Sequence, residues 1–224
     1  MPDFARLSTA SGLTVGLIGT CPPRQCGIAT FSKDLERAIQ TADPAVRVRW
    51  AAINEASSLH AYGPEVRWRI RQGDLESYRH AAVQLNLSSV DVVCLQHEFG
   101  LYGIWGDPFE DHLIGFLQEL RKPLVTTLHS VLPEPSRSVR ASVRRIAQRS
   151  HQVVVMAERA RELLLDAYGI DSTRVSVIPH GVPPIEPHGR LRMKNHLGIS
   201  GRTLITTFGL VDPRKGLEFM IDAM

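Results

Sequence analysis

The chain has 224 residues, of which 43% are hydrophobic and 22% are charged, and its formal net charge at pH 7 is +3. These proportions are those of an ordinary globular protein and exclude a disordered or fibrous chain. So small a charge argues against nucleic acid as the main partner, and three cysteines, an odd number, argue against a disulfide scaffold.

The N-terminal segment lacks the charged and then apolar layout of a secretory signal peptide. The longest apolar runs are also far shorter than the about 20 residues of a helix that spans a bilayer. We therefore expect a cytoplasmic protein with reduced thiols.

Short runs rich in Val, Ile and Leu alternate with longer amphipathic segments. The expected strands lie at residues 13–20, 46–53, 66–70, 91–96, 123–129, 152–156 and 174–178. The expected helices lie at residues 28–40, 75–85, 108–121, 136–149 and 158–168. This alternation predicts the α/β class and a doubly wound, Rossmann-like parallel sheet with helices on both faces.

The pattern changes after these strands. Residues 180–201 are rich in Pro and Gly and contain only a short helix at about 191–197, before a new strand at 203–208 and a helix that Pro213 opens. One strand and one helix cannot bury their own apolar faces, so we expect a truncated second Rossmann-like domain that exposes Leu204, Phe208, Leu217 and Ile221. The expected parts are a first domain (1–182), an interdomain linker (183–201) and the start of the second domain (202–224).

Ligands of an open parallel sheet bind at the carboxyl ends of its strands, so the segments after each strand matter most. The first strand is followed by TCPPRQCGIATF, residues 20–31, in which Gly27 lies where the loop becomes a helix. The free N–H groups and the positive dipole end of that helix favour an anion such as a phosphate, which Gly27 lets approach closely. A glycine kept there for steric reasons is the other interpretation.

The fourth strand is followed by QHEFGLYGIWGD, residues 96–107, with His97 and Glu98 at the strand end. A His–Glu pair can orient a hydroxyl group or transfer a proton, and aromatic side chains on a loop suit a sugar ring. A structural hydrogen bond, with the aromatic residues packed against the core, explains the same segment equally well. Both interpretations stay open here.

His129 ends the next strand at the same edge of the sheet. The two histidines lie on separate strands and not in a spacing such as H-E-x-x-H, so we expect no metal and no cofactor. Lys215, in the loop DPRKG, is either an ordinary polar loop residue or a partner for a diphosphate across a cleft. The basic helix at 136–149 is either a solvated face or a peripheral contact with an anionic membrane surface.

Five segments together resemble the retaining glycosyltransferases of family 4, which have the GT-B fold of two facing Rossmann-like domains. The segments are CPPRQCGIATF (21–31), LQHEFGLYG (95–103), PLVTTLH (123–129), VIPHGV (177–182) and FGLVDPRKGLE (208–218). No single segment is specific to the family, and the combination and order of the five carry the resemblance.

The resemblance implies a nucleotide-diphosphate sugar donor, held mostly by the second domain, and a carbohydrate or lipid-linked acceptor, held mostly by the first. It implies that Gly27 and Lys215 bind the donor diphosphate, that His129 is a catalytic residue at the transferred sugar, and that His97 and Glu98 face the acceptor. The chain departs from the family at Leu210, where a basic residue is usual, and the family's E-x7-E pair of glutamates would fall beyond residue 224.

The expected function is therefore hexosyltransferase-like transfer of a sugar to an acceptor hydroxyl with retention, by a chain that is incomplete at 224 residues. The alternative is a non-catalytic acceptor-binding half, or an inactive fragment, that needs a separate donor-binding domain. A nicotinamide-dependent Rossmann enzyme is disfavoured, because the sequence has no G-x-G-x-x-G and no acidic residue at the end of the second strand (Ala51, Ala52 and Ile53).

Overall fold

The computed structural model describes residues 12–55, 60–182, 184, 186–209, 211 and 213–224. The chain divides into two compact units, Met1–Gly181 and Val182–Met224. Each unit is described by itself below.

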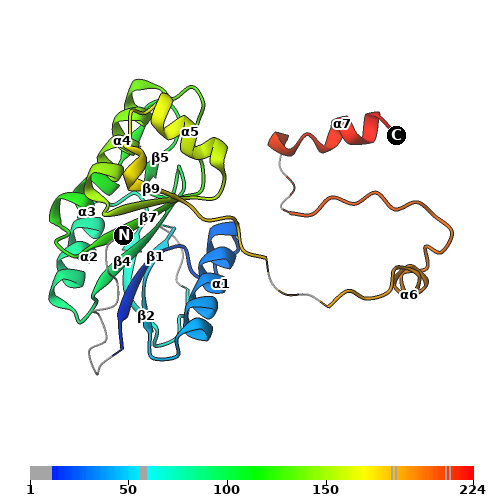
Figure 1. Ribbon diagram of the computed structural model, residues 1–224, viewed down its shortest axis with the longest axis horizontal. Coiled ribbons are helices and arrows are strands. Elements are labelled where there is room, and N and C mark those ends of the chain that lie inside the picture. Colours follow the sequence, from blue (N-terminus) through cyan, green and yellow to red (C-terminus); the bar gives the residue numbers. More distant parts are fainter. Residues whose placement is uncertain (1–11, 56–59, 183, 185, 210, 212) are drawn as a thin grey trace. The chain divides into compact units, whose positions relative to one another are not determined.

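The first unit is built on a seven-stranded sheet in the order β3-β2-β1-β4-β7-β8-β9 (Figure 1). All neighbouring strands in this sheet are parallel. The strands are β1 (Thr14–Gly19), β2 (Arg47–Asn54), β3 (Val66–Arg71), β4 (Val92–His97), β7 (Leu124–Leu128), β8 (Gln152–Val155) and β9 (Val175–Val177). The predicted α/β class and parallel sheet are thus confirmed.

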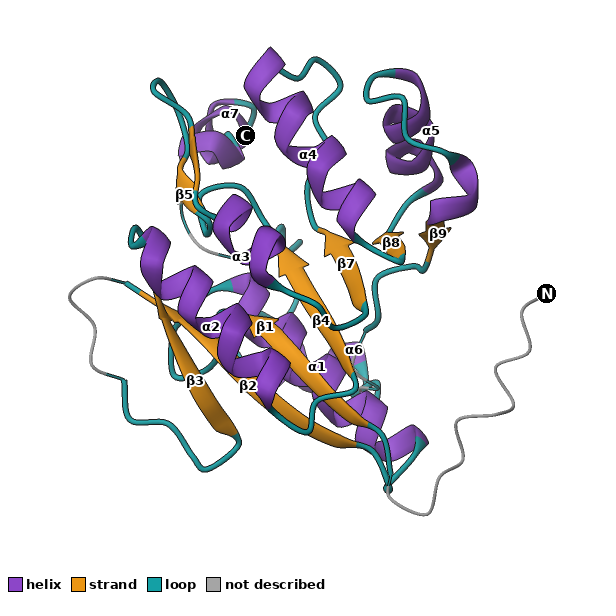
Figure 2. Ribbon diagram, turned by 90° about the vertical axis from the view of Figure 1, so that its left-hand side faces the viewer, coloured by secondary structure: helices purple, strands orange, loops and turns teal. Residues whose placement is uncertain are grey.

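Helices cover both faces of the sheet (Figure 2). They are α1 (Gly27–Ala42), α2 (Leu75–Leu87), α3 (Leu113–Glu119), α4 (Arg137–Arg149) and α5 (Glu158–Asp166). On one face Leu35 and Ile39 of α1 pack on a cluster around the fully buried Trp50 of β2. On the other face, apolar residues of α2 to α5 share one continuous core with the alternate strand residues. On β2 the residues alternate between the two cores, with Ala51 and Ile53 in one and Trp50 and Ala52 in the other, because successive strand residues point to opposite faces.

The strand order reverses beside β1, because β2 and β3 extend the sheet on one side of it and β4 to β9 on the other. In doubly wound sheets, this reversal leaves a crevice at the carboxyl ends of the flanking strands. The fold therefore directs attention to the segments that follow β1 and β4.

The predicted helix at 108–121 is wrong in its first part. Residues before α3 form a short antiparallel hairpin of β5 (Gly103–Ile104) and β6 (Glu110–Asp111). Gly103 has a φ of +147°, and a Cβ atom there would lie 2.0 Å from the carbonyl oxygen of Glu110. Only glycine fits where Gly103 passes so close to the backbone of Glu110. Strands of two residues are too short to show a hydrophobic period, so the sequence does not reveal this hairpin.

The second unit contains α6 (Arg190–His196), the short 3-10 turn η3 (Pro213–Lys215) and α7 (Leu217–Asp222). The predicted strand at 203–208 is wrong, since these residues form no strand. A strand needs a neighbour to pair its backbone N–H and C=O groups, and the described part of this unit offers none. Leu204, Phe208 and Ile221 are exposed as expected, whereas Leu217 is half-buried.

Within the described ranges, no helix has both the length and the apolar composition needed to cross a membrane.

Candidate functional site

The carboxyl ends of three neighbouring strands, β1, β4 and β7, form one edge of the sheet, which we call the rim. Gly27, His97 and His129 follow or end these strands. The backbone N–H of His129 donates to the carbonyl oxygen of His97 over 3.0 Å. The ring of Phe31, one turn into α1, packs edge-on against the His129 ring with 4.7 Å between centroids. The loop before α1 and the tips of β4 and β7 therefore converge on the same side of the sheet.

Gly27 is the first residue of α1. The Cys26 side chain caps this helix, since its Sγ accepts from the N–H of Ala29 at 3.4 Å and lies 2.9 Å from the Thr20 hydroxyl. A Cβ atom at Gly27 would meet no atom of the described residues within 4 Å, so packing against them does not require glycine here. The first turn of α1 also carries no acidic residue. This helix end therefore has the space and the positive dipole that an anion needs.

His129 is held by a side chain that we had not singled out in the sequence. Its Nε2 lies 2.9 Å from Oε1 of Gln96, whose amide nitrogen lies 3.4 Å from Sγ of Cys94. With the amide oxygen towards the ring, Nε2 of His129 carries the proton and Nδ1 is an acceptor. The signal for Gln96 in the sequence was a polar residue near the end of a buried apolar strand.

The charge state of His129 is also set by its surroundings. Burial lowers the pKa of His129 to about 4, and repulsion from His180 is the second cause. The His180 ring packs edge-on against Phe31, with 5.1 Å between centroids. At neutral pH the rim therefore presents His129 as an uncharged imidazole, which accepts a hydrogen bond from a hydroxyl group and adds no positive charge.

His97 lies beneath the rim and is only 4% exposed. Its ring stacks on Tyr102 with 5.5 Å between centroids, and Phe99 packs edge-on against it at 5.2 Å. Burial lowers its pKa to about 4, with repulsion from His129 as the second cause. Among the described residues, Nδ1 of His97 is buried without a hydrogen-bond partner. The carbonyl oxygen of His97 thus holds the backbone of His129 in place. A contact between His97 and an acceptor stays a prediction.

Glu98 connects the loop after β4 to the loop after β7 by hydrogen bonds. One carboxylate oxygen accepts from the N–H of Phe99 at 2.9 Å, and the other accepts from the hydroxyl of Ser130 at 2.8 Å. Ser130 follows β7, so this contact fixes the loop after β4 against the loop after β7. The structural hydrogen bond that the sequence left open is present, and an acceptor role for Glu98 stays a prediction.

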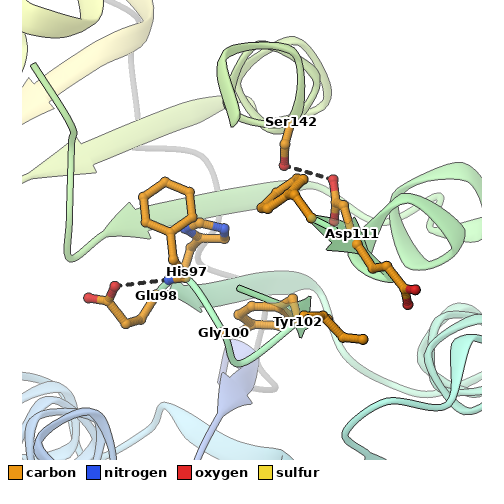
Figure 3. A pocket seen from close by; sticks show the side chains of 11 residues that line it. His97, Glu98, Gly100, Tyr102, Asp111 and Ser142 are labelled. Atoms are coloured by element: carbon orange, nitrogen blue, oxygen red, sulfur yellow. Dashed lines mark hydrogen bonds between the residues drawn. The ribbon is translucent and has the colours of Figure 1, made fainter. Parts of the chain in front are cut away.

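Two cavities lie beside the rim and share Gly103. The first lies between the loop after β4, the β5–β6 hairpin and α4, with Ser142 donating to Asp111 at 2.7 Å (Figure 3). Its volume of about 10 Å³ holds no more than a water molecule. The second, open cavity has a volume of about 330 Å³ and is lined by Arg24, Glu55, Gln72, Gly73 and Gly103. Only the second cavity has the size of a small-molecule site, about 300 Å³ or more.

The remaining predictions concern Lys215 and the arginines of α4. Lys215 is an exposed residue of η3 in the second unit, and its role at a diphosphate stays a prediction. On α4, Arg145 pairs with Asp111 at 3.4 Å and Arg149 donates to backbone carbonyls, whereas Arg137, Arg140 and Arg144 are exposed. A membrane contact through α4 also stays a prediction.

Residues 105–185 match the family model described as Glycosyltransferase Family 4. This region includes β7, α4 and His129. Gly27, His97, Glu98 and Lys215 lie outside it. A comparison with curated protein sequences found no match.

Two solved structures have a similar fold. HepE of Anabaena, in complex with UDP and glucose, is 15% identical to this chain, with a TM-score of 0.62. The similar region covers 94% of this chain and 57% of the HepE chain. A glycosyltransferase from Rickettsia africae is 13% identical, with a TM-score of 0.53. The similar region covers 85% of this chain and 50% of the Rickettsia chain. The chain thus spans about half the length of these proteins. It is glycosyltransferase-like in residues 105–185 and in the fold of its parallel sheet.

Proposed function

We propose that this chain is the acceptor-side part of a retaining glycosyltransferase that uses a nucleotide-diphosphate sugar. The observation that carries the proposal is the convergence of Gly27 and His129 at one rim, joined by the contact between Phe31 and the His129 ring. An anion site and a neutral imidazole side by side suit a diphosphate and the sugar attached to it.

In this proposal the donor diphosphate lies at the start of α1. The N–H groups of Ile28 and the residues that follow stabilise the negative charge that grows on the departing phosphate oxygen. The predicted role of Lys215 as a cation at a diphosphate concerns the second unit and stays a prediction. Nδ1 of His129 accepts a hydrogen bond from a hydroxyl of the transferred sugar and holds that sugar in position.

The transfer proceeds on one face of the sugar. The acceptor oxygen forms a bond to the anomeric carbon while the bond from that carbon to the β-phosphate oxygen breaks. The acceptor proton passes to the departing phosphate oxygen, and the configuration is retained. Glu98, the carboxylate of the rim, is already engaged by Ser130 and Phe99, which disfavours the double displacement of retaining glycosidases.

Calorimetric titration tests the donor part of this proposal. We expect the chain to bind a nucleoside diphosphate, from a panel of UDP, GDP and ADP, and not to bind NAD. Binding of NAD in preference to all three diphosphates would contradict the proposal, because a nicotinamide enzyme would then explain the Rossmann-like sheet.

A non-catalytic acceptor-binding half is the second candidate. It is favoured by the second unit, in which no described side chain is buried and the predicted strand at 203–208 is absent. Such a half would bind an acceptor sugar but no nucleoside diphosphate on its own, and it would bind the nucleotide only with a separate donor-binding domain.

A further inference from the structure

We propose that the 330 Å³ cavity lined by Arg24, Glu55, Gln72, Gly73 and Gly103, here the Arg24 pocket, binds one uncharged sugar ring. That this ring belongs to the acceptor rests on the proposed function. Binding of the ring itself follows from the pocket alone.

The Arg24 pocket is assembled from four loops at the carboxyl side of the sheet. Arg24 lies between β1 and α1, Glu55 directly follows β2, Gln72 directly follows β3, and Gly103 opens the β5–β6 hairpin. Because β1 to β3 are adjacent and parallel, the pocket lies at the same edge of the sheet as the rim. Arg24 is also only three residues before Gly27.

Arg24 is fixed in the wall of the pocket. Its side chain is 13% exposed, and one terminal nitrogen donates to the carbonyl oxygen of Ile53 at 3.3 Å and to Oε1 of Gln72 at 3.2 Å. The other terminal nitrogen pairs with Glu55 at 3.2 Å. A guanidinium held on three sides loses little conformational entropy when its remaining N–H groups bind a ligand.

Gln72 connects the pocket to the loop after β4. Its amide oxygen accepts from Arg24, and its amide nitrogen donates to the carbonyl oxygen of Gly100 at 2.6 Å. Both ends of the amide are thus used, which makes Gln72 a positioning residue. Backbone at Gly73 and Gly103 lines the pocket without side chains.

The charges in the pocket select the class of ligand. The guanidinium of Arg24 and the carboxylate of Glu55 stand side by side, so the pocket presents hydrogen-bond donors and acceptors with little net charge. Sugar hydroxyl groups both donate and accept, and they match such a lining. For a phosphate or carboxylate on the ligand, repulsion by Glu55 offsets the attraction by Arg24, so the pocket offers an anion no net gain. Among the described residues, no side chain of the lining is apolar, which disfavours a lipid chain.

Ligand-observed NMR on the full chain tests the proposal. The neutral probes are the methyl α-glycosides of glucose, mannose and galactose, and the anionic probes are glucuronate and glucose 6-phosphate, each at about 10 mM because a single ring binds weakly. We expect saturation transfer to at least one neutral glycoside and at most a fifth of that signal for either anionic sugar. Equal or stronger transfer to an anionic sugar, or none to any neutral glycoside, would overturn the proposal.

Substitutions locate the binding. Arg24→Met should reduce the signal of the neutral glycoside at least fivefold, whereas Arg67→Met, at an exposed arginine of β3, should leave it unchanged. Glu55→Gln removes the negative charge and should raise binding of the anionic sugars above that of wild type. If Arg24→Met proves unfolded, Arg24→Lys takes its place. The lysine keeps the charge but not the paired N–H donors of the guanidinium, and it should weaken the signal of the neutral glycoside. Retention of the full neutral signal in a folded Arg24 variant would overturn the assignment.

The same samples are titrated with UDP, GDP and ADP, which separates the two proposals. Diphosphate binding without any sugar signal rejects the Arg24 pocket and leaves the proposed function standing. A sugar signal that depends on Arg24, without diphosphate binding, supports the pocket and counts against the donor part of the proposed function.

Discussion

Nε2 of His129 lies 2.9 Å from Oε1 of Gln96, and this contact joins the end of β4 to the tip of β7. The hydrogen bond fixes the proton on Nε2 and leaves Nδ1 as the acceptor at the rim. A fully buried amide side chain, and not a carboxylate, thus orients the histidine. An amide cannot stabilise an imidazolium as a carboxylate would, which agrees with a neutral His129.

The first prediction concerns His129 itself. In the proposed function this residue contacts the transferred sugar and not the diphosphate. His129→Ala should therefore lower affinity for a nucleotide-diphosphate sugar about tenfold, since about 1.4 kcal/mol of hydrogen bonding is lost, and leave affinity for the free nucleoside diphosphate unchanged. Calorimetry with both ligands measures the difference.

Gln96→Leu provides the companion measurement, because it removes the orienting partner and keeps the imidazole. We expect a smaller loss for the sugar nucleotide than in His129→Ala. Equal losses for the free diphosphate and for the sugar nucleotide in His129→Ala would place this residue at the diphosphate and contradict the assignment.

The second prediction concerns stability against pH. The pKa values of His97 and His129 fall from 6.5 to about 4 on folding, so the unfolded chain binds more protons between these values. The unfolding free energy therefore falls as pH is lowered from about 6.5 to about 4, by roughly 3 kcal/mol for the fully buried His97 and by less for His129. Urea titrations at pH 7 and pH 4.5 measure this change.

His97→Phe should flatten that dependence, because it keeps the stacking on Tyr102 and removes the titrating ring. His80→Gln, which removes an exposed histidine of α2 and no buried ring, is the matched control. An unchanged slope in His97→Phe would show that His97 is not the source.

The third prediction concerns the start of α1. Gly27→Asp places a carboxylate where the diphosphate is proposed to lie, and it should weaken nucleoside diphosphate binding at least tenfold through like-charge repulsion. Gln40→Glu adds the same charge near the other end of the helix, roughly 20 Å away, and should change binding less than twofold. Similar effects of the two variants would indicate a general charge effect and no site at Gly27.

The fourth prediction separates two glycines by their surroundings. In Gly103→Ala the new Cβ atom would clash with the carbonyl oxygen of Glu110, and the backbone would keep a positive φ that alanine disfavours. This substitution should lower the unfolding free energy by about 2 kcal/mol or more. Gly27→Ala meets no atom and should change it by less than about 1 kcal/mol, in the stabilising direction. Thermal unfolding compares the two variants, and a Gly103→Ala protein as stable as wild type would contradict the hairpin geometry.

The sequence was sufficient to predict the sheet of the first unit. The buried strands β4 and β7 are short segments rich in Val and Leu, and they alternate with longer amphipathic segments such as α2. The strand predicted at 203–208 failed for the opposite reason, since propensity alone cannot supply a pairing neighbour.

The candidate site was only partly predictable. The order of the strands along the chain indicated that Gly27, His97 and His129 would share an edge, but burial decides what each can do. His97 stacks on Tyr102, and the hydrogen bond that His129 donates to Gln96 depends on which strands become neighbours. Arg24 was not singled out, because its partners Glu55 and Gln72 are far from it in the sequence.

The most direct test of the central claim is a map of where a nucleoside diphosphate binds. In ¹⁵N-labelled protein, the backbone amide resonances are followed as the tightest of UDP, GDP and ADP is added. We predict that the largest shifts fall on Gly27 to Thr30, with small shifts across β8 and β9. Shifts centred elsewhere on the sheet, with Gly27 to Thr30 unmoved at saturation, would contradict the account.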